Sequence, residues 1–154
     1  MGQSGSGKST LVHCINGMVP FSYPGESSGT LTVGGKDPAK TGIFGMSKIV
    51  GTVLQDTDGQ FIGLTVAEDV AFALENDCVE QEEMFRAVDE VAEVVDIKAL
   101  LGNAPTELSG GQKQRVSMAG VLVDDVDILL FDEPLANLDP ATGTRAIYLL
   151  DRIC

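Results

Sequence analysis

The first ten residues, MGQSGSGKST, contain a pattern of glycine, lysine and serine that typically binds phosphate. Gly2, Gly7, Lys8 and Ser9 stand at the spacing G-x-x-x-x-G-K-[ST]. Glycines permit positive φ angles that bring backbone N–H groups close to phosphate oxygens, and the helix that follows directs its positive end at the same point. Lys8 is expected to reach the β- and γ-phosphates, and the Ser9 hydroxyl to ligate Mg²⁺. We predict a phosphate-binding loop made by Gly2, Ser4, Gly5, Ser6, Gly7, Lys8, Ser9 and Thr10.

Two carboxylates end an apolar run in the last third of the chain. In the segment DILLFDEP, the uninterrupted apolar residues 128–131 are typical of a parallel strand that is buried on both faces. Asp132 suits the role of holding Mg²⁺ through water, and Glu133 suits the role of polarising an attacking water. Two acids at a strand end also occur by chance, so this segment alone leaves the chemistry open.

Between these two segments lies LSGGQKQR, residues 108–115. Ser109 can cap a helix, and Gly110 and Gly111 at the start of that helix can leave N–H groups exposed to an anion. A glycine-rich helix start that binds nothing is the alternative for this segment taken alone.

The phosphate-binding loop, LSGGQ and LLFDEP, in this order, resemble the nucleotide-binding subunit of ATP-binding cassette (ABC) ATPases, and the resemblance covers essentially all 154 residues. It implies ATP and Mg²⁺ as cofactors, and two subunits that enclose each ATP between the phosphate-binding loop of one and the signature segment of the other. The signature residues are then Ser109, Gly110, Gly111 and Gln112.

The same resemblance assigns further roles by position. Gln55 resembles the glutamine that ligates Mg²⁺ and senses the transport partner, so the metal ligands are expected to be Ser9, Gln55 and Asp132. The catalytic residues are then Glu133, Gln55 and Lys8. Asp139, in ANLD, resembles the aspartate that communicates across the dimer.

Strands that alternate with helices predict an α/β protein with ligand at the carboxyl ends of its strands. With the resemblance, the expected fold is the P-loop NTPase (RecA-like) core of an ABC ATPase, a single partial domain over 1–154 with a helical signature subdomain over about 65–123. The pattern predicts helices and strands at the following positions: helices over 7–15, 65–75, 80–96, 109–123 and 141–153, and strands over 30–35, 48–55 and 128–131.

Parts of the family pattern are missing from this sequence. The N-terminal antiparallel strands are largely absent, as are the aromatic residue that stacks on adenine and the switch histidine that follows the LD segment. The single histidine, His13, is expected to be an ordinary residue of the helix over 7–15. The sequence is therefore expected to be a fragment that has little or no ATPase activity alone.

Three segments, INGMVP, GQFIGLTVAEDVAFALEN and FDEPLANLDP, resemble the ATPase of energy-coupling-factor (ECF) transporters, which import vitamins and metal ions. This branch implies a membrane coupling subunit that contacts the region 60–76, a separate substrate-binding membrane subunit, and a second ATPase half that is identical, different or fused in tandem. It also implies a peripheral location on the cytoplasmic face of the cell membrane. Two segments, PFSYPGESSGTLTVGGKD and DEPLANLDP, resemble most the subgroup of this branch that imports a thiamine precursor. The alternative for Phe61, Val70 and Phe72 is an ordinary core role.

Composition excludes several classes. A formal net charge of −13 disfavours binding to a nucleic-acid backbone, and three scattered cysteines indicate neither a disulfide framework nor a metal site. No apolar run approaches the roughly 18 residues that cross a bilayer. A chromosome-structuring ABC ATPase carries a long coiled coil between its phosphate-binding loop and its signature segment. Ser9 and Leu108 are too close in this sequence for such an insertion. Two alternatives stay open: a truncated, non-catalytic remnant, and a soluble ABC ATPase without a transport role, such as a ribosome-associated factor.

Overall fold

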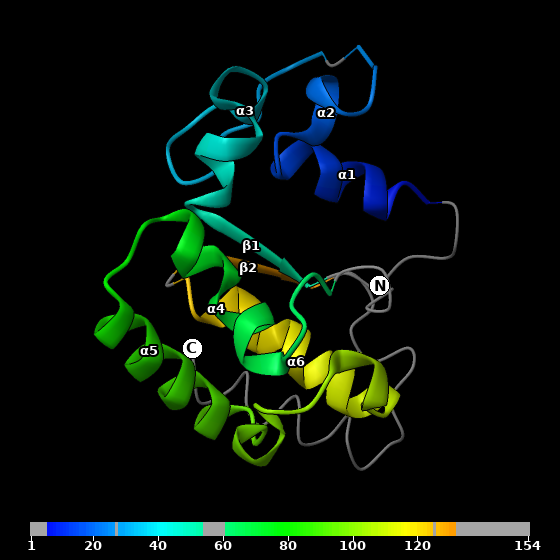
Figure 1. The fold of residues 1–154 in the computed structure, drawn as a ribbon. Helices are drawn as coiled ribbons and strands as arrows, with labels where there is room; N and C mark the ends of the chain where they lie inside the picture. Colours follow the sequence, from blue (N-terminus) through cyan, green and yellow to red (C-terminus); the bar gives the residue numbers. More distant parts are fainter. Residues whose placement is uncertain (1–5, 27, 54–60, 125, 132–154) are drawn as a thin grey trace. The chain divides into compact units, whose positions relative to one another are not determined.

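The structure, a computed structural model, describes residues 6–26, 28–53, 61–124 and 126–131 (Figure 1). The chain forms two compact units. The first unit comprises residues 1–52 and 126–132, and the second comprises residues 53–125 and 133–154.

The first unit contains three helices and most of a two-stranded sheet among its described residues. They are α1 (Lys8–Ile15), α2 (Met18–Phe21), α3 (Pro38–Ser47), β1 (Val50–Val53, whose last residue is assigned to the second unit) and β2 (Ile128–Phe131). The helix predicted over 7–15 is confirmed, and the strands predicted over 48–55 and 128–131 are confirmed at β1 and β2. Gln55, at the end of the first of these ranges, lies outside the described residues.

Helix α3 was not predicted from the sequence. Asp37 caps it, because one carboxylate oxygen of Asp37 accepts a hydrogen bond of 3.1 Å from the Ala39 backbone N–H, and Pro38 occupies the first turn. Gly42 interrupts the helical geometry with φ 78° and ψ 170°. The two glycines in PAKTGIFGMS lower the helical propensity of the segment, which explains why its pattern escaped the prediction.

The core of the first unit lies where α3 and the strands meet. Its buried residues are Val33, Met46, Ile49 and Val50, and Ile15, Ile128 and Leu130 pack against them. The Ile128 backbone N–H donates a hydrogen bond of 2.9 Å to the Ile49 carbonyl, just before β1. This core therefore holds the end of α1 and the two strands together.

The strand predicted over 30–35 is wrong. The described structure has a single antiparallel bridge there, between Val33 and Lys36, which exchange backbone hydrogen bonds of 2.8 and 3.0 Å. Gly34 and Gly35 form the turn with φ 53° and 76°, a pair of positive angles that suits two-residue hairpin turns. Val33 is buried, but an isolated strand is not stable without a hydrogen-bonded neighbour.

The second unit is helical in its described part. Its elements are α4 (Val66–Asn76), α5 (Gln81–Val94), the short 3₁₀ helices η1 (Lys98–Leu100) and η2 (Pro105–Glu107), and α6 (Gly110–Leu122). Helix α4 packs against both α5 and α6, which lie on either side of it in Figure 1. Fully buried side chains of this unit include Val66, Val70, Val95, Ile97 and Val116. The helical segment predicted over about 65–123 lies within this unit.

The predicted helix starts of the second unit are confirmed. Thr65 and Glu68 form a capping box at α4, and Ser109 and Gln112 form another at α6. On α5 the predicted apolar stripe is buried at Val88 and Val91 and continues past the helix end at Val95. The helix predicted over 141–153 lies outside the described residues.

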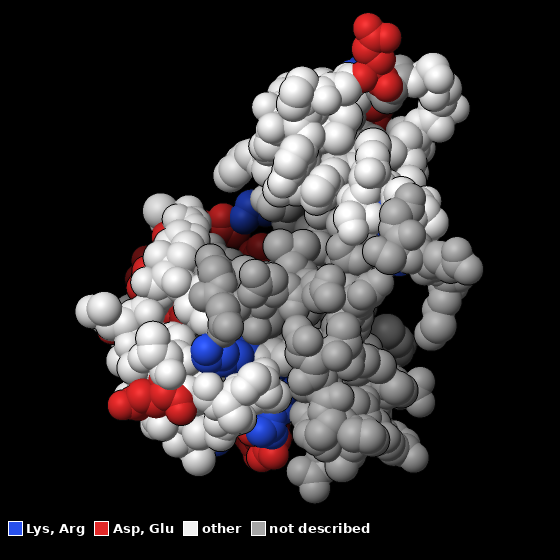
Figure 2. Space-filling view, turned by 90° about the vertical axis from the view of Figure 1, so that its right-hand side faces the viewer, with Lys and Arg blue, Asp and Glu red and all other residues white. Residues whose placement is uncertain are grey.

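The surface of the described residues has no single acidic face in the view of Figure 2, where red side chains stand in separate groups with blue ones among them. A net charge of −13 spread in this way is typical of a solvated surface. Among the helices of the described residues, none combines the length and the apolar character that crossing a membrane requires.

Candidate functional site

The described part of the predicted phosphate-binding loop turns directly into α1. Gly7 has φ 82° and precedes the first helical residue, Lys8, and the Leu11 backbone N–H closes the first turn by donating to the Gly7 carbonyl at 3.0 Å. A side chain at Gly7 would meet no atom within 4 Å, so the left-handed backbone, and not lack of space, selects glycine. Ser9 and Thr10 are exposed on the first turn and Lys8 is half-buried. Gly2, Ser4 and Gly5 lie outside the described residues, while Ser6 is exposed.

The far end of α1 is tied to the sheet. Thr52 Oγ1 on β1 donates a half-buried hydrogen bond of 3.1 Å to Asn16 Oδ1, at the C-cap of α1. The helix stops there because Gly17 follows with φ 71°. A helix anchored at its C-terminus can present a fixed N-terminus, so this bond supports the loop geometry from behind.

Strand β2 directly precedes the two predicted carboxylates in the sequence. It ends at Phe131, immediately before Asp132 and Glu133. Those two residues, together with Gln55 and Asp139, lie outside the described residues. Their roles in metal binding, catalysis and dimer communication therefore stay predictions.

The predicted signature segment forms the start of α6. Ser109 Oγ accepts a hydrogen bond of 3.4 Å from the Gln112 N–H, and the Ser109 N–H donates one of 2.8 Å to Gln112 Oε1. Ser109 and Gly110 are exposed, and a side chain at Gly110 would meet nothing within 4 Å. Ser109 and Gly110 thus lie exposed among the described residues, at the positive end of a helix of 13 residues. This arrangement can receive an anion on a second surface.

Before α4, a short stretch of apolar residues is held by two carboxylates. We call Phe61–Thr65 the apolar segment. Asp69 Oδ1 accepts hydrogen bonds from the N–H groups of Ile62 (2.7 Å) and Gly63 (3.0 Å). Glu68 Oε2 accepts from those of Leu64 (2.9 Å) and Thr65 (3.2 Å). Four consecutive N–H groups are thus bound by the first turn of α4.

This binding fixes the apolar segment while leaving its side chains in solvent. Ile62 is 66% exposed and Leu64 is 82% exposed. Gly63 is required by crowding, because a Cβ there would lie 2.4 Å from the Asp69 backbone nitrogen. Sequence reasoning found the role of Glu68 but missed those of Asp69 and Gly63. The available signal was a glycine followed by a helix start with two acids in its first turn.

A pocket of about 150 Å³ lies between the apolar segment, α4 and α6. It is lined by Phe61, Ile62, Asp69, Phe72, Ser117, Gly120 and Val121. Val70 is fully buried, so the core alternative holds for that residue, whereas Phe72 is 41% exposed. Phe61 is half-buried at the pocket. Within the region 60–76, Ile62, Leu64 and Phe72 therefore present apolar side chains to solvent.

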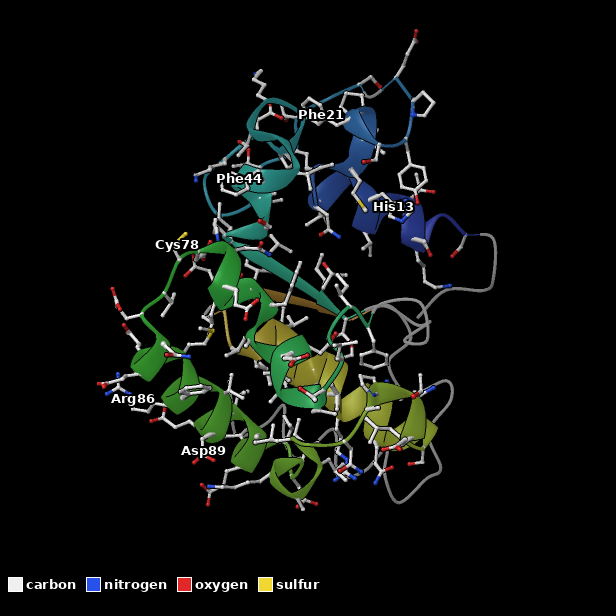
Figure 3. All side chains as sticks on the ribbon, in the orientation of Figure 1. His13, Phe21, Phe44, Cys78, Arg86 and Asp89 are labelled. Carbon is white, nitrogen blue, oxygen red and sulfur yellow. The ribbon has the colours of Figure 1, made fainter. Side chains whose placement is uncertain are left out.

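His13 lies on α1, as Figure 3 shows. Its ring stacks on Tyr23 with the ring centroids 4.4 Å apart and the planes nearly parallel. It is a half-buried residue of that helix, as the sequence predicted.

Comparison with known proteins decides the family. A sequence profile described as ABC transporter matches residues 1–136. The chain belongs to the ABC transporter family. Residues 1–136 span the phosphate-binding loop, the signature segment and the carboxylates after β2, so one family pattern accounts for all three motifs.

Curated relatives of the chain are described as ABC transporter ATP-binding proteins. A putative ABC transporter ATP-binding protein of Enterococcus faecalis is 63% identical over 153 residues, which are 99% of this chain and 27% of that protein. A protein of the same description from Clostridium perfringens is 63% identical over 152 residues, again 99% of this chain and 27% of the relative. The chain thus spans about a quarter of the length of these curated relatives.

A solved structure of cbiO1 from Clostridium perfringens, described as part of the ABC transporter complex cbiONQ, resembles the chain with a TM-score of 0.86. The two sequences are 35% identical, and the match covers 99% of this chain and 60% of that one. The predicted fold class, the P-loop NTPase core of an ABC ATPase, is confirmed.

Proposed function

We propose that the whole protein, of which this chain spans a part, hydrolyses ATP to power import across a membrane as the ATPase of an ECF-type ABC transporter. The observation that carries the proposal is the capped start of α6, where Ser109 and Gly110 are exposed in a chain that also contains a phosphate-binding loop. An exposed signature segment has no use within one subunit, because in this family it completes the ATP site of another. A second ATPase half, identical, different or fused in tandem, is therefore part of the proposal.

The proposed site residues have separate roles in binding ATP, in catalysis and in communication with partners. Lys8 and the N–H groups of Ser4–Thr10 hold the phosphates, and Glu133 takes the role of orienting and polarising the attacking water. Ser109, Gly110, Gly111 and Gln112 contact the ATP of the partner subunit, and Asp139 communicates across the dimer. Gln55 links the site to the transport partner.

The residues assigned to Mg²⁺ suit that metal by their chemistry. Ser9 supplies a hydroxyl, Gln55 an amide oxygen and Asp132 a carboxylate, and Mg²⁺ prefers such oxygen ligands. Ser9 is exposed on the first turn of α1, where a metal beside the phosphates can reach it. When bound, Mg²⁺ neutralises charge on the phosphate oxygens.

The membrane coupling subunit is proposed to dock on the region 60–76. Ile62, Leu64 and Phe72 offer exposed apolar surface there, and the pocket beside Phe61 can receive an apolar side chain. The fixed N–H groups of the apolar segment reduce the entropy that docking would otherwise remove. We therefore propose a peripheral location for the whole protein, at the cytoplasmic face of the membrane.

The imported substrate is proposed to be a vitamin, a thiamine precursor or a metal ion. A separate substrate-binding membrane subunit selects it. The similarity to cbiO1, part of an ABC transporter complex, and the three segments that resemble ECF ATPases support this branch.

The test is the substitution Glu133→Gln in the whole protein with its partner half. Turnover should fall by a factor of about 100 or more while ATP stays bound in a closed dimer, because the glutamine cannot polarise water as a carboxylate does. Glu83→Gln, at an exposed position on α5, is the matched control and should keep full turnover. Unchanged hydrolysis by Glu133→Gln would contradict the assignment.

A second test addresses the remnant alternative. The 154-residue chain alone should show little or no ATPase activity, while the whole protein should hydrolyse ATP. Robust hydrolysis by the chain alone would overturn the first expectation. Absence of hydrolysis by the whole protein with its partner would favour the remnant.

A further inference from the structure

Helix α5 ends in an unusual conformation that α6 stabilises. The residue after its C-cap, Asp96, has φ 58°, which is in the left-handed region. The Asp96 N–H donates to the Glu93 carbonyl at 3.3 Å and the Ile97 N–H donates to the Ala92 carbonyl at 2.8 Å. These two bonds form a Schellman motif, in which the left-handed position is usually glycine.

Asp96 is unfavourable at this position mainly because of its charge. Aspartate is one of the few residues besides glycine that adopt the left-handed backbone, but a negative charge is unfavourable near the negative end of a helix. A residue that is unfavourable for its local backbone is often held there by a contact with another part of the structure. Here that contact comes from a different helix.

Arg115, on α6, makes that contact. Its Nη1 donates to both the carbonyl oxygen (3.0 Å) and the carboxylate Oδ2 (2.9 Å) of Asp96. The Arg115 side chain is 23% exposed and the Asp96 side chain 82% exposed, so a largely covered guanidinium binds a carboxylate at the surface. Its buried Nε has no hydrogen-bond partner among the residues that the structure describes. Both of these bonds hold the guanidinium to Asp96.

The position of Arg115 along α6 connects this pair to the signature segment. Arg115 lies four residues after Gly111 and three after Gln112, so it shares a helix face with both, one turn further along. A tie at this point limits how α6 can tilt or rotate about its first turn. The direction of the backbone N–H groups of Gly110 and Gly111 depends on that tilt.

We infer that Arg115 and Asp96 are a positioning pair that aims the signature segment at the ATP held by the partner subunit. The inference rests on the proposed function, because it needs an ATP shared between two subunits. The pair does not touch nucleotide. It acts by fixing the start of α6 against the end of α5.

The test exploits a matched position in the same unit. Cys78 has φ 55° and follows α4 in the same way: its N–H donates to the Glu75 carbonyl at 3.0 Å, and the Val79 N–H donates to the Leu74 carbonyl at 3.0 Å. Asp96→Gly and Cys78→Gly relieve the same backbone strain, but Asp96→Gly alone removes the carboxylate that Arg115 binds. The variants are made in the whole protein with its partner half, and ATPase activity, nucleotide affinity and melting temperature are measured.

We expect Cys78→Gly to keep wild-type turnover. Asp96→Gly should fold with a melting temperature close to that of the wild type, yet show kcat lower by about 10-fold, as small misplacements of reacting groups can cause. Nucleotide affinity of the phosphate-binding loop should stay unchanged in both. Arg115→Met should lower kcat by a similar factor, and the double variant Asp96→Gly with Arg115→Met should fall no further.

A second ion pair provides an independent control. Lys98 Nζ lies 2.7 Å from Asp89 Oδ2, and Asp89 projects from α5 in Figure 3. Asp89→Asn weakens a pair of similar length at the surface and should leave kcat unchanged.

Two results would overturn the inference in distinguishable ways. If Asp96→Gly keeps wild-type kcat while Gly110→Asp in the signature segment abolishes it, the positioning role is wrong and the proposed function stands. If Gly110→Asp also keeps wild-type activity, the signature segment does not act on ATP, and the proposed function fails together with the inference.

Discussion

Thr52 on β1 and Asn16 at the end of α1 are joined by a half-buried side-chain hydrogen bond of 3.1 Å. The bond spans 36 residues of sequence and ties the helix behind the predicted phosphate-binding loop to the strand that leads toward Gln55. A loop that binds phosphate through backbone N–H groups depends on a fixed helix. The first prediction therefore concerns the loss of this hydrogen bond.

Thr52→Val should lower the free energy of unfolding by about 1 kcal/mol, because Asn16 loses the donor to its half-buried side-chain oxygen. ATP affinity of the whole protein should weaken by a few-fold, since α1 becomes less firmly anchored. Denaturant unfolding and nucleotide titration measure the two effects. Thr52→Ser keeps the hydroxyl and serves as the control; an equal loss of affinity in Thr52→Ser would argue against the hydrogen bond as the cause.

The crowding at Gly63 leads to a second prediction. In Gly63→Ala, the new Cβ would lie 2.4 Å from the Asp69 nitrogen and 2.8 Å from the Thr65 carbonyl oxygen, so the apolar segment must move. The free energy of unfolding should fall by about 1–3 kcal/mol, and binding to the membrane coupling subunit should weaken. Gly102→Ala, where a Cβ meets nothing within 4 Å, is the matched control. Binding by Gly63→Ala at wild-type strength would contradict the assigned docking region.

The sequence was sufficient for elements whose signals are local. The predicted starts of α4 and α6 agree with the structure, where Thr65 and Ser109 each form a capping box with a residue within the first turn of the helix. The apolar run of β2 was recognised for a similar reason, since burial on both faces leaves a continuous hydrophobic segment.

Features that depend on distant partners escaped prediction. Arg115 and Asp96 are 19 residues apart, and nothing in either local pattern indicates that they meet. The strand predicted over 30–35 failed for the opposite reason: its alternation was present, but a strand needs a hydrogen-bonded neighbour, and the described structure gives Val33 only the turn to Lys36.

A third prediction concerns pH. The hydrogen bond from Lys40 to Asp37 lowers the pKa of the Asp37 carboxyl below its model-compound value. A lowered pKa in the folded state means that Asp37 contributes stability above its unfolded pKa, and that this contribution is lost as pH falls through the folded pKa. In NMR titrations of the side-chain carboxyl, Lys40→Met should raise the pKa of Asp37 while leaving the Asp37 cap on α3 in place. Lys36→Met is the control, and a pKa of Asp37 that does not respond to Lys40→Met would remove Lys40 as the cause.

The final prediction separates stability from function at the signature segment. Gly110→Asp places a carboxylate on the first turn of α6, where open space accommodates it and the positive helix end favours it. The melting temperature should therefore stay the same or rise slightly. The same charge would repel the phosphates of ATP presented by a partner subunit, so ATP-driven dimerisation and hydrolysis should be lost. Gly102→Asp introduces an equal charge at a glycine that also has open space, and it should leave both activities intact. Hydrolysis by Gly110→Asp at the wild-type rate would mean that the exposed start of α6 binds no phosphate.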